Sequence, residues 1–168
     1  MKGVFEKRPS LPRYTHTWDV NIVLKFLQSL PQTEQLELKK LTLKLVTLLT
    51  ILPGQRCQTI HFVDIQHMHL DDKSVTFHIE KLVKQSKHGR HISKLEFSAY
   101  TPDDKLYVVN CVKENIKRSE HIRGKVTQLF VSYVKTFGAV SKETIRRWIK
   151  TVLSKAGINT DVFKQCWN

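Results

Sequence analysis

Apolar residues recur along the chain at intervals of three and four, the spacing that places them on one face of an α-helix. The clearest stripe lies in 142–156, between a cap at Ser141 and a stop at Gly157, and consists of Ile145, Trp148, Ile149, Val152, Leu153 and Ala156. Similar stripes predict helices from Thr17 to Pro31, Thr33 to Leu52, Gln55 to Phe62 and Asp103 to Arg118. Most of the chain is therefore expected to be helical.

Two segments instead have the alternating pattern of β-strands. Val75 to Glu80 alternates apolar and polar residues, and 84–97 reads as a hairpin whose turn contains Gly89. Strands near 74–80 and 93–99 predict a small antiparallel sheet of about three strands. Residues 1–16 read as an extended lead-in, and 117–125 as a basic connector. The predicted fold class is α+β, mainly helical with a small antiparallel sheet.

The charge balance points to a polyanionic partner. The chain has 28 Lys and Arg against 15 Asp and Glu, a net charge of +13. Nucleic acid is the first candidate, and an anionic membrane surface is the rival. We expect no membrane association, because no segment combines a basic face with a strongly apolar one. The chain has no apolar run of about 18 residues and no signal-like start. Its three cysteines (Cys57, Cys111, Cys166) are widely spaced, as expected of reduced thiols. We therefore expect an intracellular protein, nuclear if its source is eukaryotic.

Arg56 is the first candidate for specific chemistry. It follows the helix break at Pro53-Gly54 and precedes a second apolar stretch, which would hold its guanidinium at a turn between packed elements. A planar guanidinium reaches two phosphate oxygens at once and stays charged. The alternative is an ordinary arginine facing solvent. A second group of cations, Lys84, Lys87, Arg90 and Lys94, crowds the predicted hairpin.

Taken in order, these motifs resemble the catalytic domain of tyrosine recombinases (phage-integrase-like), most closely those of DIRS-like and Crypton-type mobile elements. The resemblance spans nearly all 168 residues and rests on order and spacing. It is carried by Arg8-Pro9 to Val20, Pro53-Gly54-Gln55-Arg56, Gln85-Ser86-Lys87-His88-Gly89, Leu129 to Ser132, Val140 to Ile149 and Ala156-Gly157-Ile158.

The resemblance implies a DNA strand-cleavage chemistry without metal or other cofactor. A tyrosine attacks the scissile phosphate, arginines hold its oxygens, and a hairpin lysine protonates the leaving oxygen. Arg56 matches the first arginine, and Lys87 the lysine, with Lys84 as the alternative. Thr59 stands where many family members carry an acid, which leaves the helper of Arg56 open. Arg146, Arg147 and Lys150 are either a DNA-backbone surface or a solvated helix face.

The family's second motif, His-x-x-Arg, is expected just after Phe163, where the sequence reads Lys164-Gln165-Cys166. All four tyrosines precede that place, so none matches the nucleophile. We therefore expect 17–168 to be a truncated, inactive recombinase catalytic domain that binds DNA and forms a homo-oligomer on it. Intact relatives act in DNA recombination or integration. The alternatives are a domesticated DNA-binding module and a basic RNA-binding or protein-interaction domain. We expect no small-molecule substrate, and the eight histidines lack the ligand spacing of a zinc site.

Overall fold

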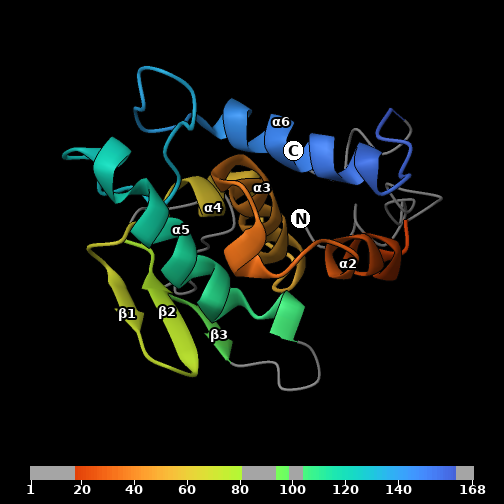
Figure 1. The fold of residues 1–168 in the computed structure, drawn as a ribbon, viewed down its shortest axis with the longest axis horizontal. Helices are drawn as coiled ribbons and strands as arrows, with labels where there is room; N and C mark the ends of the chain where they lie inside the picture. Colours follow the sequence, from red (N-terminus) through yellow and green to blue (C-terminus); the bar gives the residue numbers. More distant parts are fainter. Residues whose placement is uncertain (1–17, 81–93, 99–103, 162–168) are drawn as a thin grey trace, which may run out of the picture.

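A computed structural model describes residues 18–80, 94–98 and 104–161 of the chain. Helices form most of this part, and one small sheet lies at its side (Figure 1). The helices are α2 (Val20–Gln28), α3 (Leu38–Ile51), α4 (Cys57–His61), α5 (Val108–Arg123) and α6 (Lys142–Lys155), with 3₁₀ turns at Thr33–Gln35 and Asp104–Leu106. This confirms the predicted mixed, mainly helical fold with a small antiparallel sheet. Among the described residues, none of the helices combines the length and the apolar character needed to cross a membrane.

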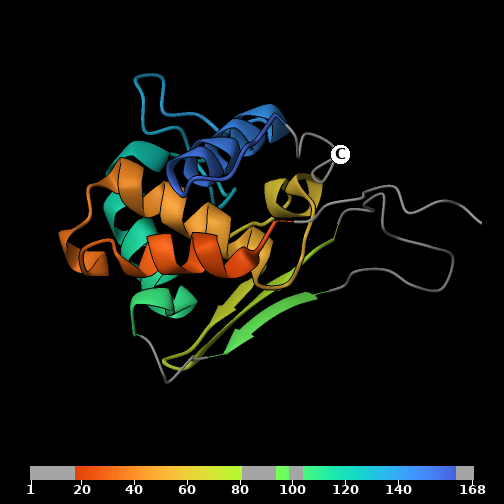
Figure 2. The same ribbon diagram turned by 90° about the vertical axis from the view of Figure 1, so that its right-hand side faces the viewer.

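Helix α3 is the centre of the core, with α5 and α6 packed against it (Figures 1 and 2). Every residue from Leu41 to Thr50 is buried, including Lys44. The hydroxyl groups of its buried threonines are hydrogen-bonded within the helix. Thr47 and Thr50 donate their hydroxyl hydrogens to the carbonyls of Leu43 and Val46, one turn earlier. The apolar stripe had predicted one buried face, whereas from Leu41 to Thr50 the helix is buried on all sides.

The sheet has the order β1 (Met68–Leu70), β2 (Ser74–His78), β3 (Lys94–Ser98), and both pairings are antiparallel. His78 pairs with Lys94 and Ser74 with Ser98, so 79–93 connects the paired ends of two neighbouring strands. Phe77 and Phe97 are buried on one face, which packs against α5. The predicted strand positions and antiparallel pairing are confirmed, while the hairpin turn lies outside the described residues.

Several predicted element boundaries differ from the structure. Asp19, not Thr17, caps α2, and its carboxylate accepts a hydrogen bond from the backbone N–H of Asn21. The predicted helix from Thr33 is a 3₁₀ turn followed by α3, and Leu52 is 48% exposed beyond the end of α3. The predicted basic connector is helical as far as Arg123, and Gly124 ends α5 with a positive φ of 54°.

Helix α6 agrees most closely with its prediction. Ser141 caps it by accepting a hydrogen bond from the N–H of Thr144. The predicted stripe is buried from Ile145 to Leu153, and Trp148 is only 5% exposed. Periodicity and capping agree here, so both boundaries follow from local sequence.

Candidate nucleic-acid interface

Arg56 lies at the end of the turn that joins α3 to α4. Gly54 has a φ of 62°, a conformation that favours glycine, and the N–H of Gln55 donates to the carbonyl of Thr50 at 2.9 Å. The carbonyl of Arg56 then accepts hydrogen bonds from the N–H groups of Thr59 and Ile60. The backbone is thus fixed on both sides of Arg56, and its side chain is exposed.

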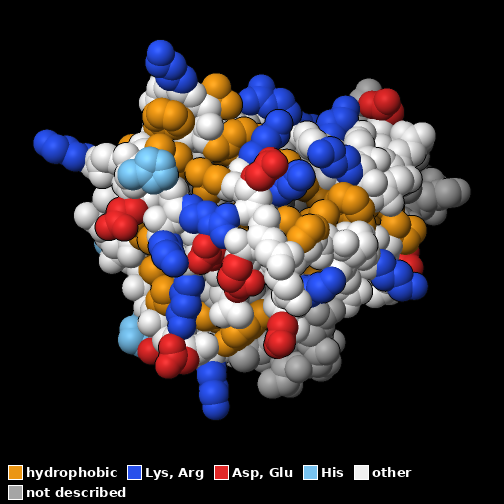
Figure 3. All heavy atoms as spheres, in the orientation of Figure 1, with side chains coloured by type: hydrophobic (Ala, Val, Ile, Leu, Met, Phe, Trp, Pro, Cys, Tyr) orange, Lys and Arg blue, Asp and Glu red, His pale blue; other side chains and the backbone are white. Residues whose placement is uncertain are grey.

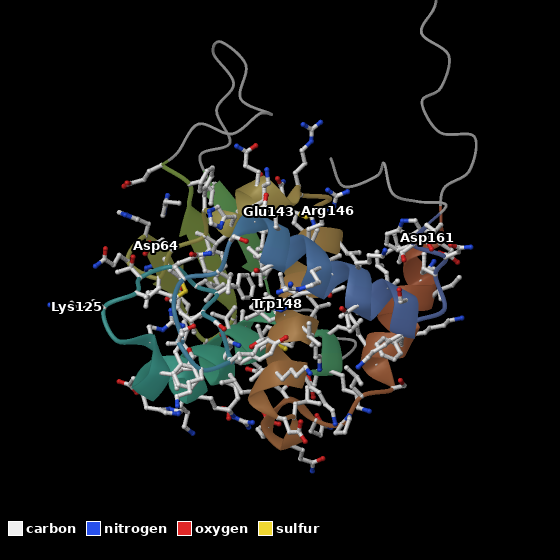
Figure 4. All side chains as sticks on the ribbon, turned by 90° about the horizontal axis from the view of Figure 1, so that it is seen from above. Asp64, Lys125, Glu143, Arg146, Trp148 and Asp161 are labelled. Carbon is white, nitrogen blue, oxygen red and sulfur yellow. The ribbon has the colours of Figure 1, made fainter. Side chains whose placement is uncertain are left out.

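Two further cations lie around the first turn of α4. Helix α6 packs against α4, and Lys142 and Arg146 lie near Cys57. Burial raises the pKa of the Cys57 thiol, while the charges of Arg146 and Lys142 act in the opposite direction. Figure 4 shows Arg146 on the edge of α6 that faces α4, and Trp148 on the opposite edge. We call Arg56, Lys142 and Arg146 the α4–α6 cluster.

One acidic residue, Glu143, borders this cluster (Figure 4). A hydrogen bond to its own backbone N–H is the largest influence that lowers the pKa of its carboxyl group; Ser141, Lys142 and His61 act in the same direction. Glu143 is therefore ionised at neutral pH. Its carboxylate lies 3.8 Å from the Lys142 ammonium, in a well-exposed pair that solvent screens.

The other described cations named from the sequence lie elsewhere on α6 or on β3. Arg147 lies on the opposite flank of α6 from Arg146, beside Tyr133. Lys150 lies 3.5 Å from the carboxylate of Asp161, and Lys94 lies 2.9 Å from that of Glu96. Lys84, Lys87 and Arg90 lie outside the described residues. Of the predicted site residues that the structure describes, Arg56 and Arg146 lie at the first turn of α4. Lys150 continues the flank of Arg146 one turn further along α6.

The positive charge is distributed and interrupted by acids. Figure 3 shows Lys and Arg side chains spread over one face of the molecule, with Asp and Glu between them. In the part of the chain that the structure describes, no carboxylate lies within ion-pairing distance of Arg56 or Arg146. These two guanidinium groups thus have their full donor set available for an anion.

Thr59, the neighbour considered as a helper for Arg56, is turned into the core. It is 1% exposed, and its hydroxyl oxygen has no hydrogen-bond partner among the described residues. Its side chain lies in the core between α4 and its neighbours, whereas the Arg56 side chain is exposed. Thr59 therefore makes no side-chain hydrogen bond to Arg56 among the described residues.

Lys142 was not among the residues named from the sequence. The signal that could have identified it is its spacing, because residues four apart lie on the same flank of a helix, and Arg146 follows Lys142 by four. That flank faces α4 because of tertiary packing, which periodicity does not specify.

Two of the described histidines near the sheet have carboxylate neighbours. His67 lies 3.1 Å from Glu80, and His69 lies 3.2 Å from Asp71. Within 18–80, 94–98 and 104–161, no three His, Cys, Asp or Glu side chains are grouped so that they could hold a metal ion.

Compared with protein-family models, with curated proteins and with solved structures, the chain matches none of them.

Proposed function

We propose that this chain is a DNA-binding domain related to the catalytic domains of tyrosine recombinases, and that the α4–α6 cluster contacts the DNA backbone. The observation that carries the proposal is the exposed Arg56 side chain on a fixed backbone, with Lys142 and Arg146 around the same turn of α4. Guanidinium groups suit phosphate because their planar donors match two oxygens at once.

The net charge of +13 supports a polyanion as the partner. Each phosphate that the protein neutralises adds about 0.9 to the negative slope of log affinity against log salt on duplex DNA. We therefore expect weak, largely sequence-independent binding that falls steeply as salt increases. We expect contacts to the DNA backbone, not to base edges, to supply the affinity.

We also propose that this chain does not cleave DNA. Cleavage by this chemistry needs a tyrosine oxygen in line with the scissile phosphate. Tyr107 donates its hydroxyl hydrogen to the carbonyl of Asp72, and Tyr133 stacks on Trp148, so both rings have structural contacts. Tyr14 and Tyr100 lie outside the described residues. We expect a polypeptide of these 168 residues to form no covalent adduct with nicked DNA; a denaturation-resistant adduct would contradict this part.

The binding experiment compares two double variants that each lose two positive charges. Lys142→Ala/Arg146→Ala removes the α6 half of the cluster, and Lys117→Ala/Lys125→Ala removes two exposed cations elsewhere. Fluorescence anisotropy with duplex DNA, titrated between roughly 50 and 200 mM salt, should show the larger loss of affinity and the larger fall in slope for the first variant. Equal losses would mean that the cluster has no special role, and absence of binding at low salt would contradict DNA binding itself.

A further inference from the structure

A second polar site lies on the opposite flank of α6 from the α4–α6 cluster. It is a pocket of about 220 Å³ between the start of α3, the segment 132–134 and α6. Its lining includes Lys39, Tyr133, Val134, Arg147 and Trp148. We call it the Tyr133 pocket. Trp148 marks its place in Figure 4, on the edge of α6 that faces α3.

The pocket is built on a rigid pair of aromatic rings. The rings of Tyr133 and Trp148 are stacked, with centroids 5.1 Å apart and planes inclined by 21°. Phe130 supports Trp148 from the core, edge to face at 6.4 Å. Trp148 is 5% exposed, whereas Tyr133 is half-buried and borders the pocket. Val134, the residue after Tyr133, is 61% exposed. A flat apolar group could thus rest against a surface that is already in place.

Two cations complete the pocket. The Lys39 ammonium lies over the Tyr133 ring, 6.0 Å from its centroid, which is the outer limit of a cation–π contact. Arg147 also borders the pocket and acts on Tyr133 electrostatically. Among the ion pairs of the described residues, none includes Lys39 or Arg147. Both charges are therefore available to an anionic ligand.

The other polar groups of the pocket are already occupied. Ser132 exchanges hydrogen bonds with the backbone of Val134, and the hydroxyl of Thr151 donates to the carbonyl of Arg147. Burial raises the pKa of Tyr133, so its phenol is neutral and does not compete for the two cations. The recognition elements are the Tyr133 ring and the two positive charges. Because Trp148 stacks on the ring and the Lys39 ammonium lies over it, a base that stacks on Tyr133 has to displace this ammonium, which then pairs with the phosphate.

We propose that the Tyr133 pocket binds one unpaired nucleotide of single-stranded DNA, with its base against Tyr133 and its phosphate between Lys39 and Arg147. A cavity of about 220 Å³ is smaller than the usual range of about 300 Å³ or more for small-molecule sites. That size suits part of a polymer better than a free metabolite. In duplex DNA the base faces are stacked and unavailable, so the pocket discriminates unpaired from paired nucleotides. The inference rests on the proposed function, because it names the form of DNA that this second site selects.

The test measures anisotropy with three probes of equal length: oligo(dT), the same backbone with abasic sites throughout, and a duplex. Base stacking on an aromatic side chain is lost on alanine substitution, with a fall in affinity of about fivefold or more per base. We expect Tyr133→Ala to lose about that factor on oligo(dT) and to bind the abasic strand and the duplex as the wild type does. Tyr133→Phe, which keeps the ring, should retain oligo(dT) binding.

Charge is tested separately with Arg147→Gln and the control Lys125→Gln, a cation far from Trp148 (Figure 4). Arg147→Gln should weaken both single-stranded probes more than Lys125→Gln does. If Tyr133→Ala does not fold, the wild type still decides the matter, because equal affinity for oligo(dT) and the abasic strand would overturn the proposal. If the protein binds the duplex but binds oligo(dT) and the abasic strand equally, only this inference is overturned. If it binds none of the three probes, the proposed function is overturned as well.

Discussion

Two arginines, Arg56 and Arg123, show how differently the same side chain is used in this fold. Arg123, at the end of α5, is 6% exposed and donates hydrogen bonds to the carbonyls of Gln128 and Leu129 and to the hydroxyl of Ser119. Burial lowers the pKa of Arg123, and the charge of Asp64 acts in the opposite direction. Arg56 is exposed and has no such partners among the described residues.

The two arginines therefore differ in purpose: Arg123 stabilises the fold, and Arg56 is available for binding. Arg123 ties the end of α5 to the segment that follows it, and that segment leads to Tyr133 and the start of α6. Its donors are used inside the molecule, apart from Nε, which has no acceptor in the described part of the chain. The donors of Arg56 are all available to an external anion. Removing Arg123 should therefore alter folding, and removing Arg56 should alter binding.

The largest expected effect is that of Arg123→Ala on stability. The substitution leaves the carbonyls of Gln128 and Leu129 without their donor, and each buried polar group left unpaired costs about 1–3 kcal/mol. We expect a loss of about 3 kcal/mol in the free energy of unfolding, measured by urea titration with circular dichroism. Arg56→Ala, the matched control, should stay within about 0.5 kcal/mol. Equal losses for the two variants would remove the distinction.

The sequence predicted the elements whose signals are local. Periodicity together with the Ser141 cap was enough for α6, and alternation was enough for β2 and β3. The end of α5 was predicted wrongly because 117–123 is rich in charge and resembles a linker, although Ser119 and Arg123 in it are buried. The burial of Lys44 could not be predicted for a related reason: a charged residue is expected outside the apolar stripe, yet α3 is buried on all sides at this position.

The candidate site was predicted only in part. Arg56 was identified from the helix break that precedes it, which is a local feature. Its closeness to Lys142 and Arg146 depends on the packing of α6 against α4, between segments more than eighty residues apart. The separation of Arg146 from Arg147 has the same origin, because the two flanks of one helix meet different neighbours. No local pattern contains that information.

The next effect in size concerns the buried hydroxyl near Arg56. Thr59 carries a buried oxygen without a hydrogen-bond partner among the described residues, so Thr59→Val removes an unpaired polar group while keeping the shape. We expect stabilisation of up to about 1 kcal/mol in urea unfolding, with duplex binding unchanged. Thr47→Val is the control, since the Thr47 hydroxyl donates to the carbonyl of Leu43 and its removal should give no gain. Weakened DNA binding in Thr59→Val would instead show that this residue supports Arg56.

A smaller effect is expected for Arg56→Ala on DNA binding, because one cation among many supplies a small share of the electrostatic attraction. Loss of one phosphate contact lowers the log–log salt slope by about 0.9, so the ratio of wild-type to variant affinity should change about 3.5-fold between roughly 50 and 200 mM salt. Anisotropy titrations on one duplex measure this ratio. Arg56→Lys should keep the wild-type slope, since it keeps the charge. Identical slopes for wild type and Arg56→Ala would place Arg56 outside the DNA contact.

The smallest effect is expected for Glu143→Gln, which removes the acid beside the α4–α6 cluster. Because surface charge interactions are weak, duplex affinity should rise by about twofold or less. Stability should fall slightly, since the pKa of Glu143 is lowered in the folded state from its ordinary value of 4.5, chiefly by its backbone hydrogen bond. That contribution is fully present above the ordinary value and disappears as pH falls through the lowered one. Wild type and variant should thus differ in urea unfolding at neutral pH and converge in acid. A variant that binds duplex DNA more weakly than the wild type would show that the carboxylate positions the cluster, and Arg146 would then be the first residue to test for that dependence.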